Sequence, residues 1–218
     1  EALTHEVKDN LVHLHGGNIH TYRRMIHHMD EGIGWVMDAL RRRGSNYVAA
    51  LQRTLGERAD GSRIVLPTRA VAATEDLDLG GRVLELRAWR TAHTDNDLTV
   101  LDRATGTMFI GDLAFVGHLP VVDGSLRGFI AVTDELSSMA VAHPIPGHGR
   151  AGAWPAALAP QARYLRGLAA DVRAAIKSQR TLSQAVADVA VTGDDWLLVD
   201  AFHKRNVTAA YAELEWEE

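Results

Sequence analysis

Three short segments in the middle of the chain each contain one side chain of a kind that binds metal ions. The segments are AHTDND at 92–97, IGDL at 110–113 and IPGHG at 145–149, and the candidate ligands are His93, Asp112 and His148. An aliphatic or β-branched run lies beside each ligand, and a glycine or polar turn residue adjoins it, which is typical of a side chain at a strand end. Neutral imidazole and carboxylate suit Zn²⁺, Fe or Mn²⁺ better than Ca²⁺ or Cu(I). Three such segments in series predict the metal site of a hydrolase.

The motifs HTDND, GDL and PGHG, in this order, resemble the second half of the metallo-β-lactamase superfamily. From about Asp38 to the C-terminus the chain resembles the zinc metallohydrolases associated with quinoprotein relay systems. The three ligand motifs are general to the superfamily, whereas the C-terminal segment is closer to this one family. The resemblance is carried by LDLGGRVLELRAWRTAHTDNDLTVLDRATGTMFIGDLAF, VDGSLRGF, PGHG, WPAALAPQARYL and FHKRNVTAAYAELEWE.

This resemblance implies an α/β fold of layered α+β type, the metallo-β-lactamase-like αββα sandwich. In the superfamily a carboxylate at the position of Asp112 bridges two metal ions. The family further implies a link to quinoprotein dehydrogenases or their cofactor and a periplasmic location. Residues 1–10, however, are charged and do not form the apolar segment of a signal peptide.

The superfamily's first metal motif, His-x-His-x-Asp-His, has only a partial counterpart here. The best local match is HLHGGN at 13–18, which keeps His13 and His15 but places Gly17 and Asn18 at the aspartate and last histidine positions. His13 and His15 with His93 would form a three-nitrogen site with one open position, as expected of a catalytic zinc. Asp112 and His148 would hold a second metal ion or steady the water of the first. Without the aspartate, we expect a weakened or mononuclear site.

Two other alignments of the N-terminal region stay open. One starts at Thr4-His5 and keeps only His5 and Asp9 of the motif, and the other treats 7–12 as the opening strand, with the motif absent. Residues 1–30 are too short to supply the N-terminal sheet of a full sandwich. We therefore expect a domain at 1–150 that is shortened at its N-terminus, followed by a helical extension at 151–218.

Composition bounds the functional classes. The 218 residues have a formal net charge of −5, which gives no basic surface for nucleic acid, and no cysteine, which excludes thiolate ligands. No apolar run approaches the roughly 18 residues of a membrane helix. The expected partner is a small-molecule substrate, without nucleic acid or membrane, and a homo-oligomer stays open. Three hypotheses remain: a hydrolase with one or two zinc ions (or Fe or Mn), a degenerate relative that binds metal or ligand without catalysis, and a non-metal scaffold.

The elements that must position the ligands follow from hydrophobic periodicity. Period-two runs predict strands at 64–66, 83–89, 98–101 and 108–110, with turns at Gly80-Gly81 and at 102–106. Apolar spacing of three and four residues predicts helices within 35–55, 124–142, and 158–176, the first broken near Gly44, and TLSQ at 181–184 predicts a capping box. His118 and His143 are predicted to be surface or structural residues, His203 to cap or pack, and Trp154, Trp196 and Trp216 to be buried.

Overall fold

A computed structural model describes residues 48–63, 65, 70–191 and 196–217 of the chain. The chain divides into two compact units, Glu1–Thr68 and Arg69–Glu218. In the first unit, residues 48–55 are helical, as predicted, and a 3₁₀ helix, η1, follows at Gly56–Ala59. His13 and His15, and the two other alignments of the first metal motif, lie outside the described residues.

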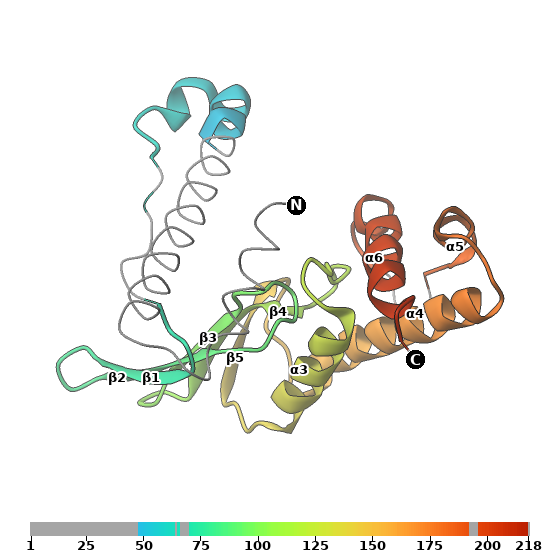
Figure 1. Cartoon of the computed structure of the whole chain (residues 1–218). Coiled ribbons are helices and arrows are strands. Elements are labelled where there is room, and N and C mark those ends of the chain that lie inside the picture. Colours follow the sequence, from blue (N-terminus) through green and yellow to red (C-terminus); the bar gives the residue numbers. More distant parts are fainter. Residues whose placement is uncertain (1–47, 64, 66–69, 192–195, 218) are drawn as a thin grey trace, which may run out of the picture. The chain divides into compact units, whose positions relative to one another are not determined.

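The second unit contains a five-stranded sheet in the order β1-β2-β3-β4-β5 (Figure 1). Its strands are β1 (Thr74–Asp78), β2 (Val83–Ala88), β3 (Leu98–Asp102), β4 (Thr107–Phe115) and β5 (His143–His148). The first four strands pair antiparallel, and β5 pairs parallel with β4. Both predicted turns are confirmed, and at the first of them Gly80 and Gly81 have φ values of 85° and 92°, which glycine adopts without strain.

Strand β1 was not predicted from the sequence, β5 was expected only as the strand end that carries His148, and β4 is longer than predicted. Strand β1 reads TEDLD, with three acidic residues, and β5 reads HPIPGH, with two prolines, so neither shows the usual β-branched run. Strand β4 continues past Ile110 to Phe115. The expectation that Asp112 ends a strand is therefore wrong: it lies within β4, where the pairing with β5 is irregular on either side of Gly111.

The helices of the second unit lie on one side of the sheet (Figure 1). The predicted helix after Gly124 is confirmed as α3 (Leu126–Ser138), which connects β4 to its parallel neighbour β5. The short η2 (Ala156–Leu158) leads into α4 (Ala159–Lys177), and α5 (Leu182–Asp188) and α6 (Val199–Leu214) complete the described helices. The capping box at Thr181 and Gln184 is present as predicted. No described helix has the length and apolar character needed to cross a membrane.

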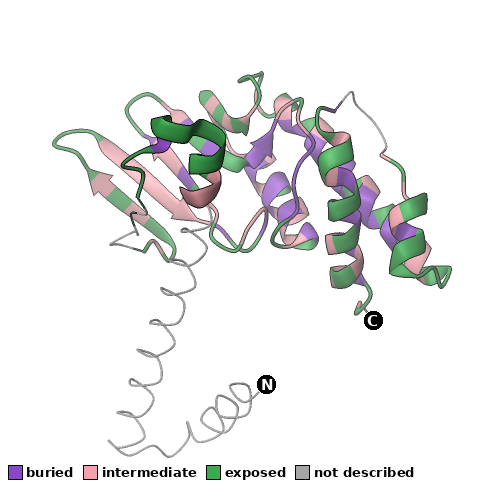
Figure 2. Ribbon diagram, turned by 90° about the horizontal axis from the view of Figure 1, so that it is seen from above, coloured by how far each residue is buried: buried purple, intermediate pink, exposed green. Residues whose placement is uncertain are grey.

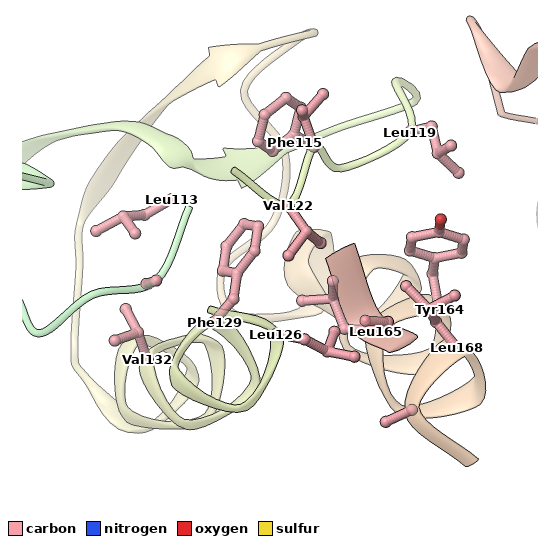
Figure 3. Packing of buried hydrophobic residues seen from close by; sticks show 14 of the residues in the cluster. Leu113, Phe115, Leu119, Val122, Leu126, Phe129, Val132, Tyr164, Leu165 and Leu168 are labelled. Carbon is pink, nitrogen blue, oxygen red and sulfur yellow. The ribbon is translucent and has the colours of Figure 1, made fainter. Parts of the chain in front are cut away.

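Buried residues gather where β4 meets α3, α4 and α6, whereas β1 and β2 carry exposed and half-buried residues (Figure 2). In this core Phe129 of α3 packs with Phe115 and Val122, and Leu165 of α4 lies beside Leu126 (Figure 3). The cluster includes side chains from both sides of residue 150. The sheet and the C-terminal helices of this unit thus share one core, and the domain boundary near residue 150 stays a prediction.

The two faces of the sheet differ in how they are covered. Met108 and Ile110 of β4 are buried, but Phe109 between them is 51% exposed. Phe109 pairs with Ile145 of β5, itself 39% exposed. One face of the sheet therefore packs on helices, and the other presents apolar side chains of the kind that a second sheet covers in a sandwich.

The three tryptophans expected to be buried behave differently. Trp196 is buried, and Trp154 is half-buried and donates from Nε1 to the Met139 carbonyl at 2.9 Å. Trp216 is 81% exposed, so the expectation is wrong there. It lies beyond the last residue of α6, where the chain leaves the core.

A buried carboxylate at the end of β3 should make the folding stability depend on pH in the acidic range. Asp102, 1% exposed, accepts hydrogen bonds from Arg82, from Thr105 Oγ1 at 2.6 Å and from the Ala104 amide at 3.1 Å. The Arg82 hydrogen bond first, and then Thr105, lower the pKa of Asp102 from 3.8 to about 2. Because the folded pKa lies below the unfolded one, this stabilisation is complete above about pH 4 and is lost as the pH falls toward 2.

We therefore expect Asp102→Asn to lower the Tm by a few degrees at pH 7 and to flatten the decrease in Tm between pH 4 and 2. Thermal melts across this pH range measure both effects. Asp76→Asn, which removes an exposed partner of Arg103, is the control and should change the Tm little. An unchanged pH profile in Asp102→Asn would contradict the prediction.

Candidate metal centre

The structure brings together the three predicted ligands of the described region. His93 lies in the loop between β2 and β3, Asp112 within β4, and His148 at the last residue of β5. His93 Nε2 is 3.6 Å from Asp112 Oδ2, and His148 Nε2 is 3.5 Å from Asp112 Oδ1. The Asp112 carboxylate thus lies between two imidazoles, and each of its oxygens faces one of them.

Two glycines allow this approach of β4 and β5. Gly111 has φ +62°, a conformation that turns the backbone of β4 just before Asp112. A Cβ atom on Gly147 would lie 2.1 Å from Asp112 Oδ1 and 2.6 Å from the carbonyl carbon of Gly111. Only a residue without a side chain fits at position 147, and the glycine of PGHG is therefore part of the geometry of the site.

The ring of His93 is oriented by backbone groups. Its Nδ1 lies 2.7 Å from the Val121 carbonyl oxygen, which can only accept a hydrogen bond. Nδ1 therefore carries a proton, and Nε2 is the ring nitrogen that faces Asp112. Beside the ring, the Asp97 carboxylate accepts hydrogen bonds from the Thr94 amide at 3.0 Å and from Thr94 Oγ1 at 2.7 Å. Asp97 thus braces the turn beside His93.

Aromatic rings surround His148. Its ring stacks on Phe115, with centroids 4.7 Å apart, and on His118, with centroids 4.6 Å apart. His118 was expected to be a plain surface residue, and that expectation is wrong, because the loop after β4 places it against a candidate ligand. The only local signal was its position six residues after Asp112. His143, at the exposed start of β5, and His203, buried in α6, take no part in this cluster; the packing role predicted for His203 is confirmed.

Each imidazole–carboxylate pair has the donor types and the separation of two zinc ligands. Two ligands at about 2.0–2.1 Å from a tetrahedral zinc ion are about 3.4 Å apart, close to the 3.5 and 3.6 Å separations here. Among the described residues, however, no group of three or more His, Asp or Glu side chains could hold a metal ion. The two imidazoles face different oxygens of one carboxylate, so a metal ion held by either imidazole–carboxylate pair needs further ligands. The predicted ones, His13 and His15, are outside the described residues, and the ligand roles of all five residues stay predictions.

Sequence reasoning missed the buried amide that holds the end of β4. Gln161 of α4 accepts from the Phe115 amide at 2.9 Å and donates to the Leu113 carbonyl and to Thr133 Oγ1, both at 2.9 Å. It is fully buried. Its signal was a polar residue that interrupts the apolar stripe of WPAALAPQARYL, at the spacing of residues that face the core.

Comparisons with solved structures identify the fold. No protein-family model and no curated protein matches the sequence. The stereoselective inverting sec-alkylsulfatase Pisa1 from Pseudomonas sp. is 15% identical, with a TM-score of 0.54 over 71% of this chain and 28% of its own. A double mutant of the same sulfatase gives 15% identity and a TM-score of 0.55 over 72% and 28%. A metallo-beta-lactamase family protein from Thermus thermophilus is 17% identical, with a TM-score of 0.51 over 79% of this chain and 58% of its own.

The chain thus spans about a quarter of the length of the sulfatase and about three fifths of that of the Thermus protein. At these identities the likeness concerns the fold, and it agrees with the superfamily-level resemblance of the motifs; the narrower resemblance to quinoprotein relay metallohydrolases stays a prediction. The chain has an α/β fold of the metallo-β-lactamase type.

Proposed function

We propose that this protein is a metal-dependent hydrolase with zinc as its metal. The observation that carries the proposal is the placement of the Asp112 carboxylate between the Nε2 atoms of His93 and His148, at ligand-to-ligand distances. His13 and His15 would complete the ligand set. Solved structures of the same fold include a sulfatase, which is a hydrolase, and this supports an enzyme.

The residues of the chain would divide the work as follows. Zinc lowers the pKa of bound water to about 7, and it stabilises negative charge on an oxygen of the substrate. Asp112 presents one oxygen toward each imidazole, and the Val121 carbonyl keeps the lone pair of His93 Nε2 directed at the site. Phe115 and His118 stack on the His148 ring, which limits its rotation.

We propose an ester, a thioester or a lactam-type amide as the substrate, attacked at its carbonyl carbon. The sulfatase of the same fold adds a secondary alkyl sulfate to the compounds worth testing. The C-terminal segment FHKRNVTAAYAELEWE supports an association with a quinoprotein system, through its resemblance to that family.

A protein that binds metal or ligand without catalysis is the second candidate. Its support is the presence of Gly17 and Asn18 where the superfamily motif has an aspartate and a histidine. Loss of that aspartate removes the carboxylate that orients the attacking water in the superfamily. The two candidates share the metal ligands and differ in turnover.

Metal content and hydrolysis together test the proposal. Elemental analysis of the wild type should find one or two zinc ions per chain, and fewer in each of His93→Ala, Asp112→Ala and His148→Ala. His143→Ala, at the exposed far end of β5, is the matched control and should keep the wild-type content. The wild type should hydrolyse at least one compound of an ester, thioester, lactam and alkyl sulfate panel, with loss of activity on chelation.

The outcomes separate the candidates. Zinc bound through these residues without turnover of any compound would favour the binding protein. Both candidate functions would be overturned by a wild type that is free of metal, together with three variants whose thermal melts and metal content equal those of the wild type.

A further inference from the structure

A buried asparagine of α6 holds the backbone on both sides of Val121. Asn206 Nδ2 donates to the Pro120 carbonyl at 2.7 Å, and Oδ1 accepts from the Val122 amide at 3.0 Å. Asn206 is fully buried, so water cannot replace its hydrogen bonds to these two peptide groups. The residue between them, Val121, supplies the carbonyl that binds His93 Nδ1 at 2.7 Å. The Asn206 side chain thus positions the Val121 carbonyl, which accepts the hydrogen bond from the candidate metal ligand His93.

With the His203 ring neutral, the rest of the network has a single arrangement of protons. His203 Nε2 lies 3.0 Å from the Val189 carbonyl, which only accepts, so Nε2 carries the proton and Nδ1 accepts. The donor to Nδ1 is the Tyr164 hydroxyl at 3.2 Å, and the Tyr164 oxygen in turn accepts from Asn206 Nδ2 at 2.9 Å. Burial raises the pKa of Tyr164 to about 12, which keeps this hydroxyl protonated. The Asn206 amide is therefore fixed with its oxygen toward Val122.

A second contact from α6 holds the other end of the same segment. Glu213 accepts from the Leu126 amide at 2.6 Å and from Ser125 Oγ at 2.8 Å, at the start of α3. The Ser125 amide donates to the Ala92 carbonyl at 2.9 Å, directly before His93. His203, Asn206 and Glu213 are three, seven and ten residues apart along α6, a spacing that puts them on one face of a helix. The side chains on this face of α6 bind residues 120–126, and the loop that carries His93 packs against that segment.

Resting on the proposed function, we infer that α6 is a positioning element of the metal centre, in which Asn206, oriented by Tyr164 and His203, selects the Nδ1–H tautomer of His93. Partners that fix the second nitrogen of a metal-binding histidine typically change metal affinity about 10- to 100-fold when removed. A purely structural network would stabilise the helix packing and leave the tautomer of His93 unchanged. The tautomer of His93 therefore distinguishes a network that positions this ring from one that only stabilises helix packing.

The test measures the tautomer of His93 in metal-free, ¹⁵N-histidine-labelled protein, from long-range ¹H–¹⁵N correlations at a pH where the ring is neutral. His93→Ala assigns the signals. The wild type should show the Nδ1–H form. Asn206→Leu, similar in size but unable to bind Pro120 or Val122, should shift His93 toward the tautomer mixture of a free imidazole and weaken zinc binding about 10- to 100-fold.

Two further variants keep the test decisive. Tyr164→Phe removes one hydroxyl and should shift the same signals less, and it carries the test if Asn206→Leu does not fold. Val172→Ala, which shortens a fully buried side chain of α4 outside the network, should lower the Tm without altering the His93 signals. An Nε2–H tautomer in the wild type, or an unchanged tautomer in folded Asn206→Leu, overturns the inference. A wild type that binds no zinc refutes the proposed function instead, because the tautomer is measured without metal.

Discussion

Gly147→Ala should empty the proposed metal centre and reduce the proposed hydrolytic activity at least 100-fold, although the substituted residue has no functional group. The new Cβ atom would lie 2.1 Å from Asp112 Oδ1 and 2.6–2.7 Å from the carbonyl group of Gly111. Rotation of the carboxylate could relieve the first contact, but the second is with backbone and requires β4 and β5 to separate. Overpacking of this kind costs about 1–3 kcal/mol of stability, which a folded domain usually tolerates.

Elemental analysis and the substrate panel measure the effect, and circular dichroism shows whether the variant folds. Gly152→Ala is the control substitution, since its Cβ would meet only the Ala157 Cβ, at 3.3 Å. That variant should keep both metal and activity. Wild-type zinc content in folded Gly147→Ala would show that Asp112 is not a ligand in the geometry described above.

Gln161→Leu should destabilise the fold strongly, to an extent similar to Asn206→Leu. Leucine has nearly the same size but leaves the Phe115 amide and the Leu113 carbonyl, both on β4, without their partner. Each buried polar group that loses its hydrogen bond costs about 1–3 kcal/mol, so the free energy of unfolding should fall by roughly 2–6 kcal/mol. For a chain of this size that corresponds to a Tm lower by roughly 4–24 °C.

Thermal and denaturant unfolding measure this loss directly. Gln184→Leu, at the exposed capping box of α5, is the matched substitution and should cost about 1 kcal/mol or less. A Gln161→Leu variant as stable as Gln184→Leu would mean that water or a rearranged Thr133 replaces the amide. Zinc binding should weaken together with stability, because Leu113 and Phe115 follow Asp112 on the same strand.

Local features of the sequence were enough to predict several elements. The glycine pair at 80–81, the turn at 102–106, the amphipathic stripes of α3 and α4 and the capping box at Thr181 each depend on neighbouring residues. Such signals act over a few residues, so they survive in any tertiary context that does not oppose them. Strand β1 and the bounds of β5 escaped prediction because pairing with neighbours, rather than intrinsic preference, makes these residues strands.

The sequence by itself determined the candidate ligands His93, Asp112 and His148, because each is marked by the turn residues beside it. Tertiary structure alone decided that they face one another, that Asp112 lies within a strand, and that His118 stacks on His148. It also decided the supports of the site, since Gln161 binds β4 from 46 and 48 residues away and Asn206 binds Val122 from 84 residues away. Contacts over such separations depend on how helices pack on the sheet, and the spacing of residues along the chain does not predict them.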